Sequence, residues 1–283
     1  MPQLQSSHID ALKAGFAGQV LLPGSGDYDK ARAIWNAMID KKPGAIARCA
    51  NTADVVKAVK LAREHGITLA VRGGGHNIAG SALCNDGLVI DMSGMKAATV
   101  NVAARRVTVE AGATLGDFDA ACLPHGLATP VGINSTTGLA GLTLGGGFGW
   151  LSRKYGMTVD NLESAELVLA SGDVVRVSAT ENPDLFWAIR GGGGNFGVVT
   201  KFEFRLHPVG PDVLSGLVVY PIEQAKQVLQ KYREFVAKAP DDLSVWSVLR
   251  LAPPLPFLPE GAHGKGMPAL SERNGTVPPM FWY

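Results

Sequence analysis

The feature that most constrains this chain is a set of three glycine-rich segments. The sequence has 35 glycines in 283 residues, and they concentrate in residues 73–80, 138–149 and 191–197. Glycine loses more conformational freedom on folding than any other residue, so such runs cost stability. They indicate places where the backbone must approach another group more closely than a side chain allows. The first run, RGGGHNIAG at 72–80, also sets His76 directly behind three glycines.

The common glycine-rich phosphate sites do not fit these segments. No stretch reads GxxxxGK[ST], which excludes a P-loop. Gly192, Gly194 and Gly197 satisfy GxGxxG, but the residues before them predict a helix and those after them a strand. A Rossmann dinucleotide site needs the reverse order, so we set it aside. The hydrolase patterns GxSxG and HExxH are also absent.

Composition excludes further classes. The net charge is +1 and no basic run occurs, so nucleic acid is not an expected partner. The first residues lack a signal-peptide pattern and no apolar stretch reaches membrane-spanning length, so we expect no membrane partner and a cytoplasmic location. Cys49, Cys84 and Cys122 are widely spaced, which predicts buried or semi-buried thiols. No histidine lies at metal-ligand spacing to another, so no metal site is expected.

Hydrophobic periodicity predicts an α+β fold. A strand at 44–50, a helix at 51–66 capped by Asn51 or Thr52, and a strand at 67–73 form a strand–helix–strand unit. Its two strands are parallel if they share a sheet. The remaining expected elements are a strand at 88–93, hairpins at 98–112 and 163–180, helices at 114–126 and 182–190, and a strand at 198–209.

A proline- and glycine-rich stretch at 208–211 predicts a domain boundary. Beyond it we expect a strand at 213–221, a helix at 222–239 and a strand at 243–253. The last residues show neither a helical nor a strand period, so an irregular tail is expected. The predicted organisation is an N-terminal segment (1–42), a main domain (43–209), an incomplete second lobe (210–252) and the tail (253–283).

The three glycine-rich turns each lie at the end of a predicted strand. Free backbone N–H groups in such turns bind anions, and several turns together suit a ligand with a diphosphate in its middle. The residues therefore favour a dinucleotide site without a Rossmann fold. His76 at the edge of that site could hydrogen bond to the ligand or attack it, and it could equally cap a turn; the residues leave both open.

Four linked motifs carry a family resemblance. They are RGGGHNIAG (72–80), IDMSGMK (90–96), TPVGINSTTGLAGLTLGGGFGWLSRKYGMTVDNL (129–162) and LFWAIRGGGGNFGVVTKFEFRLHPV (185–209). In order and spacing, residues 43–209 resemble the FAD-linked oxidases of the vanillyl-alcohol oxidase type, in the berberine-bridge-enzyme-like branch. The resemblance implies a PCMH-type FAD-binding domain of two α/β subdomains, followed by a partial α/β substrate lobe.

The resemblance also implies a function. In that family the FAD accepts a hydride from an alcohol, sugar or related CH–OH substrate, and dioxygen or another acceptor takes the electrons. The first glycine turn cradles the FAD diphosphate, and the histidine matching His76 is joined covalently to the 8α-methyl of the flavin. Tyr155 lies near the substrate face in related sequences, so we expect it to be catalytic, with packing under the ring as the alternative. The cofactor-binding residues that the resemblance implies are Arg72, Gly73, Gly74, Gly75, His76, Asn77, Gly80, Asp91, Gly132, Asn134, Ser135, Gly138, Gly141, Gly145, Gly147, Gly194, Gly197 and Val198.

Two departures from the family pattern qualify these expectations. Asn134 stands where many relatives attach the flavin a second time through a cysteine, so single attachment is expected. Thr137 occupies a position that governs dioxygen access in relatives, and oxidase behaviour is expected on family grounds.

Relatives also continue beyond this chain, which predicts a C-terminally truncated protein. The alternatives are a flavin-binding fragment without turnover and a noncovalent FAD reductase that uses NAD(P)H. The aromatic residues Trp150, Trp187, Phe196 and Phe202 are expected in the core.

Overall fold

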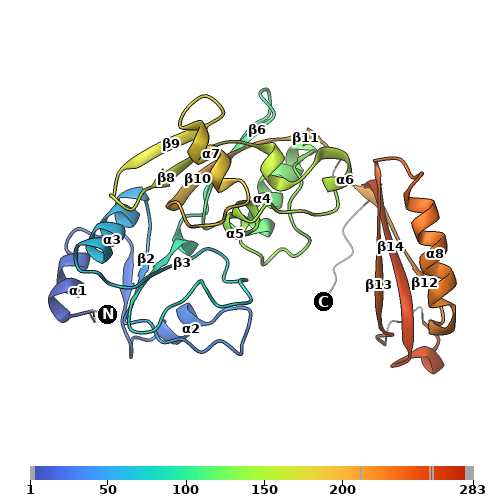
Figure 1. Cartoon of the computed structure of the whole chain (residues 1–283), viewed down its shortest axis with the longest axis horizontal. Coiled ribbons are helices and arrows are strands. Elements are labelled where there is room, and N and C mark those ends of the chain that lie inside the picture. Colours follow the sequence, from blue (N-terminus) through green and yellow to red (C-terminus); the bar gives the residue numbers. More distant parts are fainter. Residues whose placement is uncertain (1–3, 211, 255, 257, 278–283) are drawn as a thin grey trace. The chain divides into compact units, whose positions relative to one another are not determined.

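The structure is a computed structural model that describes residues 4–210, 212–254, 256 and 258–277. The chain divides into two compact units, Met1–His207 and Pro208–Tyr283. Figure 1 labels their helices and strands, and each unit is described separately below.

The first unit begins with a four-stranded sheet that is mainly parallel. Its strand order is β1 (Gln19–Leu21), β2 (Ala45–Arg48), β4 (Leu88–Asp91) and β3 (Leu69–Arg72). Both β2 and β3 pair with β4 in parallel, which confirms the parallel strand–helix–strand unit and places β4 between its two strands. The connecting helix α3 (Thr52–Glu64) begins as predicted, because the Asn51 side chain accepts the backbone N–H of Asp54 at 3.0 Å.

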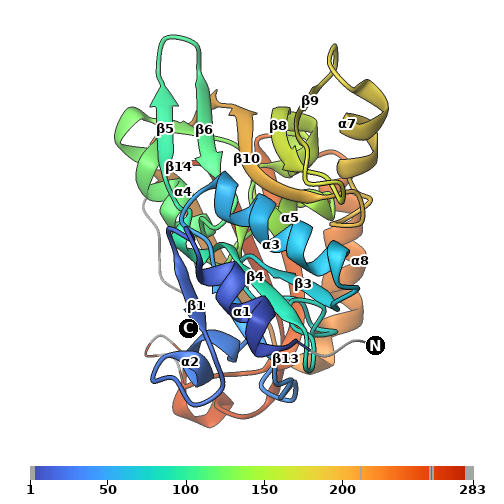
Figure 2. The same cartoon turned by 90° about the vertical axis from the view of Figure 1, so that its left-hand side faces the viewer.

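A second, antiparallel sheet completes the framework of this unit. Its strand order is β5 (Ala98–Asn101), β6 (Arg106–Glu110), β10 (Val198–Arg205), β8 (Leu162–Val168) and β9 (Val174–Ser178). The pairs β5/β6 and β8/β9 are the two predicted hairpins. Helix α3 contacts β4 of the first sheet and both β8 and β10 of the second, as Figure 2 shows. It therefore joins the two sheets into one unit.

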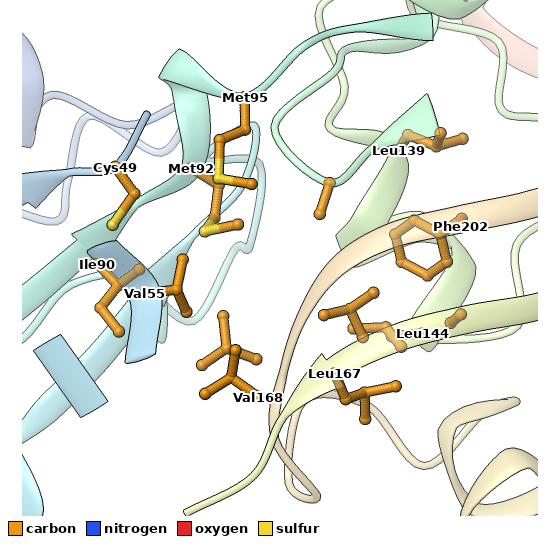
Figure 3. Close-up of a cluster of buried hydrophobic side chains, with 14 of the residues drawn as sticks. Cys49, Val55, Ile90, Met92, Met95, Leu139, Leu144, Leu167, Val168 and Phe202 are labelled. Carbon is orange, nitrogen blue, oxygen red and sulfur yellow. The ribbon is translucent and has the colours of Figure 1, made fainter. Parts of the chain in front are cut away.

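The core of the first unit lies between the two sheets. Figure 3 shows side chains from both sides meeting there: Cys49, Val55, Ile90, Met92 and Met95 face Leu139, Leu144, Leu167, Val168 and Phe202. All ten are buried. The three cysteines are free and buried, which confirms the prediction of buried thiols.

The other elements of the first unit are mostly short. They are α1 (Ser6–Lys13), α2 (Tyr28–Arg32), η1 (Met92–Gly94), α4 (Leu115–Cys122), η2 (Leu123–His125), β7 (Leu127–Ala128), α5 (Leu139–Leu144), α6 (Ser152–Tyr155), η3 (Thr158–Asn161) and α7 (Pro183–Ile189). Strand β11 (His207–Pro208) pairs with β7. Of these, α4 and α7 were predicted. The segment 1–42 was predicted only as an N-terminal segment, and it contains α1, β1 and α2.

The second unit is a three-stranded antiparallel sheet with one helix. Its strand order is β12 (Val213–Val219), β14 (Gly266–Val277) and β13 (Leu243–Leu251). Helix α8 (Ala225–Val236) follows η4 (Ile222–Gln224) and packs on β13 and β14. The short turn η5 (Glu260–Ala262) precedes β14.

The expectation of an irregular tail at 253–283 was wrong over Gly266–Val277, where β14 is the central strand of this sheet. Pro268 and Gly275 lower the strand propensity of the segment. Both edges of β14 pair with a neighbour, however, so hydrogen bonds on two sides offset the weak propensity. Residues 278–283 of the expected tail lie outside the described residues.

Candidate functional site

The three glycine-rich segments come together in the first unit. A Cβ on Gly74 would lie 2.2 Å from the backbone nitrogen of Gly138, and a Cβ on Gly138 would lie 2.3 Å from that of Gly74. The first and second segments therefore touch backbone to backbone. The third segment is tied to the second, because the N–H groups of Gly191 and Gly193 donate to the carbonyl of Leu144 at 3.1 and 2.9 Å.

A group of three charged side chains, of which only the carboxylate is fully buried, lies at the strand ends beside the first glycine turn. Arg48, Asp91 and Arg72 are register partners at the carboxyl ends of β2, β4 and β3. The fully buried Asp91 carboxylate lies 3.1 Å from Arg48 Nε and 3.7 Å from Arg72 Nη1, and it also accepts the N–H of Ser93. Two guanidinium groups and one carboxylate leave a net positive charge beside the turn, which suits an anionic ligand.

Arg72 reaches from this group toward the N-terminal segment. Its Nη2 donates to the carbonyl of Ala33 at 3.2 Å, while its buried Nε has no hydrogen-bond partner among the described residues. Asp91 itself is inaccessible, so any part it takes in the site passes through the two arginines that it holds. The expectation that Asp91 takes part in cofactor binding stays a prediction.

His76 follows the turn and has three neighbours around its ring. Its Nε2 lies 3.0 Å from Thr136 Oγ1, and its Nδ1 lies 3.4 Å from Thr137 Oγ1. The Trp35 ring stacks on the imidazole at a centroid distance of 4.8 Å. Burial lowers the pKa of His76 below its ordinary value, so the ring is neutral at pH 7 and keeps a nitrogen lone pair.

The other residues implied by the resemblance fall into two groups. Most have accessible surface in the first unit: Gly73, Gly74, Asn77, Gly132, Asn134, Ser135, Gly141, Gly145, Gly194 and Gly197. The buried ones, besides Asp91, are Gly75, Gly80, Gly138, Gly147 and Val198. Gly75, Gly80 and Gly147 have positive φ angles, so their contribution is the path of the backbone.

Tyr155 ends α6 and stacks on His207 with ring centroids 3.9 Å apart. His207 Nε2 lies 2.6 Å from Asn161 Oδ1, and Asn161 Nδ2 donates to the carbonyls of Tyr155 and Met157 at 2.9 Å each. Because the Asn161 amide nitrogen is used as a donor, its oxygen accepts and His207 Nε2 donates. The hydrogen bond to Asn161 holds the His207 ring, and the His207 ring in turn restrains the plane of the Tyr155 ring by stacking.

Two contacts of His76 were missed by the sequence analysis. Trp35 lies in the N-terminal segment, about forty residues before His76, and Thr136 lies in the third of the four motifs, at 129–162. Neither belongs to a pattern that marks it, because their role is set by tertiary contact. The expectation that Trp187 and Phe196 are core residues was also wrong, since their exposed fractions are 74% and 39%, whereas Phe202 is buried as expected.

The arrangement fits a diphosphate-bearing cofactor. Backbone meets backbone at Gly74 and Gly138, so no side chain separates these two glycine-rich segments, which together we call the glycine cradle. The arginine pair supplies positive charge beside it. Within the part of the chain that the structure describes, no three His, Cys, Asp or Glu side chains gather where they could hold a metal ion. Among those same residues, no helix has both the length and the apolar character needed to span a membrane.

Comparison with known proteins agrees with this fit. Residues 43–178 match the family described as FAD binding domain. The chain is 38% identical over 203 residues to (R)-6-hydroxynicotine oxidase from Paenarthrobacter nicotinovorans, covering 72% of this chain and 44% of that protein. The chain spans about half the length of the curated relatives that it matches.

Solved structures show the same relationship. Physcomitrella patens BBE-like 1 superposes with a TM-score of 0.83 at 30% identity, covering 94% of this chain and 56% of that one. Xylooligosaccharide oxidase from Myceliophthora thermophila C1, in complex with xylobiose, superposes with a TM-score of 0.81 at 28% identity, covering 95% and 56%. The chain therefore belongs to the FAD-linked oxidoreductases with a PCMH-type FAD-binding domain, in their berberine-bridge-enzyme-like branch.

Proposed function

We propose that this chain is an oxidase-type flavoenzyme that carries its FAD covalently on His76 and oxidises a CH–OH group of an alcohol, sugar or related small molecule. The bound FAD would supply the hydride acceptor, and the protein would position and tune it. Dioxygen is the proposed final electron acceptor, with another acceptor as the alternative. The single observation that carries the proposal is the placement of His76 at the edge of the glycine cradle.

Three properties of His76 support attachment. The imidazole is neutral because burial lowers its pKa, so a lone pair is available for bond formation. Two hydroxyls and the Trp35 ring hold it in one orientation. Gly73 and Gly74, which lie three and two residues before it, lack the side chains that would keep a flavin ring away.

The proposed substrate class is inferred from the relatives and structural neighbours. One relative is named an oxidase of 6-hydroxynicotine and one structural neighbour an oxidase of xylooligosaccharides, so the family takes chemically different small molecules. The CH–OH assignment follows the sugar-oxidising neighbour. Tyr155 is the residue that we propose on the substrate side, held by its stack on His207. A cytoplasmic location stays a prediction.

Acid precipitation tests the attachment. Full-length protein is purified, precipitated with trichloroacetic acid and washed, and the flavin fluorescence of pellet and supernatant is measured. We expect yellow colour and fluorescence in the wild-type pellet and their loss in His76→Ala. If the flavin of the wild type passes entirely into the supernatant, the covalent proposal is wrong, and a noncovalent FAD protein is indicated.

A second candidate is a flavin-binding fragment without turnover, favoured by the observation that the chain spans about half of its relatives. Stopped-flow reduction of the bound flavin by a panel of sugars, alditols and aromatic alcohols separates the two. Reduction by any of these compounds supports the enzyme. A flavin that is attached but reduced by none of them supports the fragment.

A further inference from the structure

Asn134, Thr136 and His76 form a short chain of hydrogen bonds. Asn134 Oδ1 accepts two bonds from Thr136, one from the backbone N–H at 3.0 Å and one from the hydroxyl at 2.8 Å. Thr136 Oγ1 in turn lies 3.0 Å from His76 Nε2. The three side chains come from two loops, one before α5 and one after β3, that the Gly74–Gly138 contact brings together.

The donor and acceptor of every hydrogen bond in this series follow from the bond between the Thr136 backbone N–H and Asn134. A backbone N–H can only donate, so the Asn134 atom that it meets is the amide oxygen rather than the nitrogen. That oxygen cannot donate, so the Thr136 hydroxyl gives its single proton to it. Toward His76, Thr136 can then only accept. The proton of the neutral imidazole must therefore be on Nε2.

The second hydroxyl fixes the ring orientation. Thr137 Oγ1 lies 3.4 Å from Nδ1, whereas Thr136 Oγ1 meets the other ring nitrogen, Nε2. An imidazole rotated by 180° would set carbon atoms against both hydroxyls and lose both contacts. With the proton on Nε2, Nδ1 keeps the lone pair, and the Thr137 hydroxyl is free to donate to it.

We propose that Asn134, acting through Thr136, is a positioning residue that fixes the proton of His76 on Nε2 and leaves Nδ1 as the nucleophilic nitrogen. The consequence for flavin attachment rests on the proposed function. The tautomer of His76, by contrast, is a property of the protein without flavin. Asn134 thus orients the Thr136 hydroxyl at the position where many relatives carry a cysteine. An amide oxygen with two lone pairs can hold both Thr136 donors at once.

The tautomer is measured directly. Full-length chain labelled with 15N-histidine is produced in a riboflavin-starved host, and long-range 1H–15N spectra report which ring nitrogen of His76 is protonated. We expect the wild type to show the Nε2–H form alone. In Asn134→Ala the Thr136 hydroxyl is free to donate to Nε2, so the Nδ1–H form becomes a measurable fraction. Thr136→Ser keeps a hydroxyl at this position and so preserves the hydrogen-bond relay from Asn134 through residue 136 to His76. This variant should match the wild type.

The same proteins are then mixed with FAD, and covalent flavin is followed by in-gel fluorescence. Loss of one net hydrogen bond predicts attachment about fivefold slower in Asn134→Ala, with Thr136→Ser near the wild-type rate. The matched control is Asn101→Ala, because Asn101 Oδ1 also accepts a backbone N–H, from Ala104 at 2.9 Å, in the remote β5/β6 turn. It should change neither readout.

Two results would overturn the relay: a wild-type His76 protonated on Nδ1, or an Asn134→Ala protein with the wild-type spectrum and attachment rate. A failure of the proposed function would give a different set of results. If the wild type attaches no FAD while its His76 is protonated on Nε2 and Asn134→Ala changes that tautomer, the relay stands and the covalent flavin proposal falls.

Discussion

Trp35 covers one face of the His76 ring, and its backbone N–H donates to the carbonyl of Gly75 at 3.0 Å. The stack restrains the imidazole before any ligand arrives. Aromatic stacking contributes roughly 1 kcal/mol beyond buried area, so we expect Trp35→Ala to slow flavin attachment about fivefold and Trp35→Phe to restore most of the rate. The time course of pellet fluorescence after FAD addition measures this. Trp187→Ala, which removes another exposed tryptophan, is the control. An unchanged rate in Trp35→Ala would show that the stack is irrelevant.

The protonation of His76 makes a pH prediction. Burial lowers its pKa from the ordinary 6.5, so the folded chain binds fewer protons than the unfolded chain between the two pKa values. Stability therefore falls as pH drops through that window. Attachment slows as the pH falls through the folded pKa and below it, because protonation of the folded His76 ring then removes the lone pair. We expect an NMR titration of the His76 ring in the flavin-free chain to have its midpoint below 6.5. A midpoint at or above that value would contradict the assignment.

The sequence pointed to His76 as the proposed attachment residue but did not indicate its neighbours. His76 was identifiable because it lies in a linear motif with the glycines that precede it. Trp35 and Thr136 were not, since each reaches His76 through the fold alone. For Asn134, the family pattern indicated only that this chain lacks a cysteine at that position. Its hydrogen bonds to Thr136 give it a role that no pattern could show.

At the level of elements, the contact of the turn after β3 with the start of α5 decides whether the cradle forms. Gly138 has an ordinary φ of −72°, so the space at Gly74, rather than backbone conformation, excludes a side chain there. A Cβ 2.3 Å from the Gly74 nitrogen must push the loops apart, and we expect Gly138→Ala to cost about 3 kcal/mol of stability. Urea unfolding of the flavin-free chain measures it.

Gly141 supplies the matched comparison within the same helix. A Cβ there meets nothing within 4 Å, so Gly141→Ala adds helix propensity without a clash. We expect it to stabilise the flavin-free chain by about 1 kcal/mol. Equal free energies of unfolding for the two variants would mean that the loops separate without cost and that the close contact does not organise the site.

Elements with local signals were predictable, and those made by distant pairing were not. The Asn51 cap, the two hairpins and helix α7 are encoded within short stretches. The insertion of β4 between β2 and β3 depends on contacts between segments tens of residues apart. Strand β14 was missed for the same reason, because its two partners stabilise a segment whose own propensity is weak.

On the scale of the whole molecule, the residues that we propose for flavin attachment all lie in one of the two compact units. Every residue proposed to hold the flavin, from Arg72 to Val198, lies in the first compact unit. The large hydrophobic core that joins the two sheets lies there as well. The second unit has its own sheet and its own small cluster of buried residues. Folding of the cradle should therefore need no contribution from the second unit.

A chain ending after Val209 tests this separation. It keeps both strands of the β7/β11 pair and all the glycine turns. Because the contacts that orient His76 come from residues 35, 136 and 137, we expect this shortened chain to attach FAD with the same yield and rate as the full chain. Pellet fluorescence normalised to protein measures the yield. A shortened chain that folds, by circular dichroism and gel filtration, yet stays free of flavin would show that the second unit takes part in attachment.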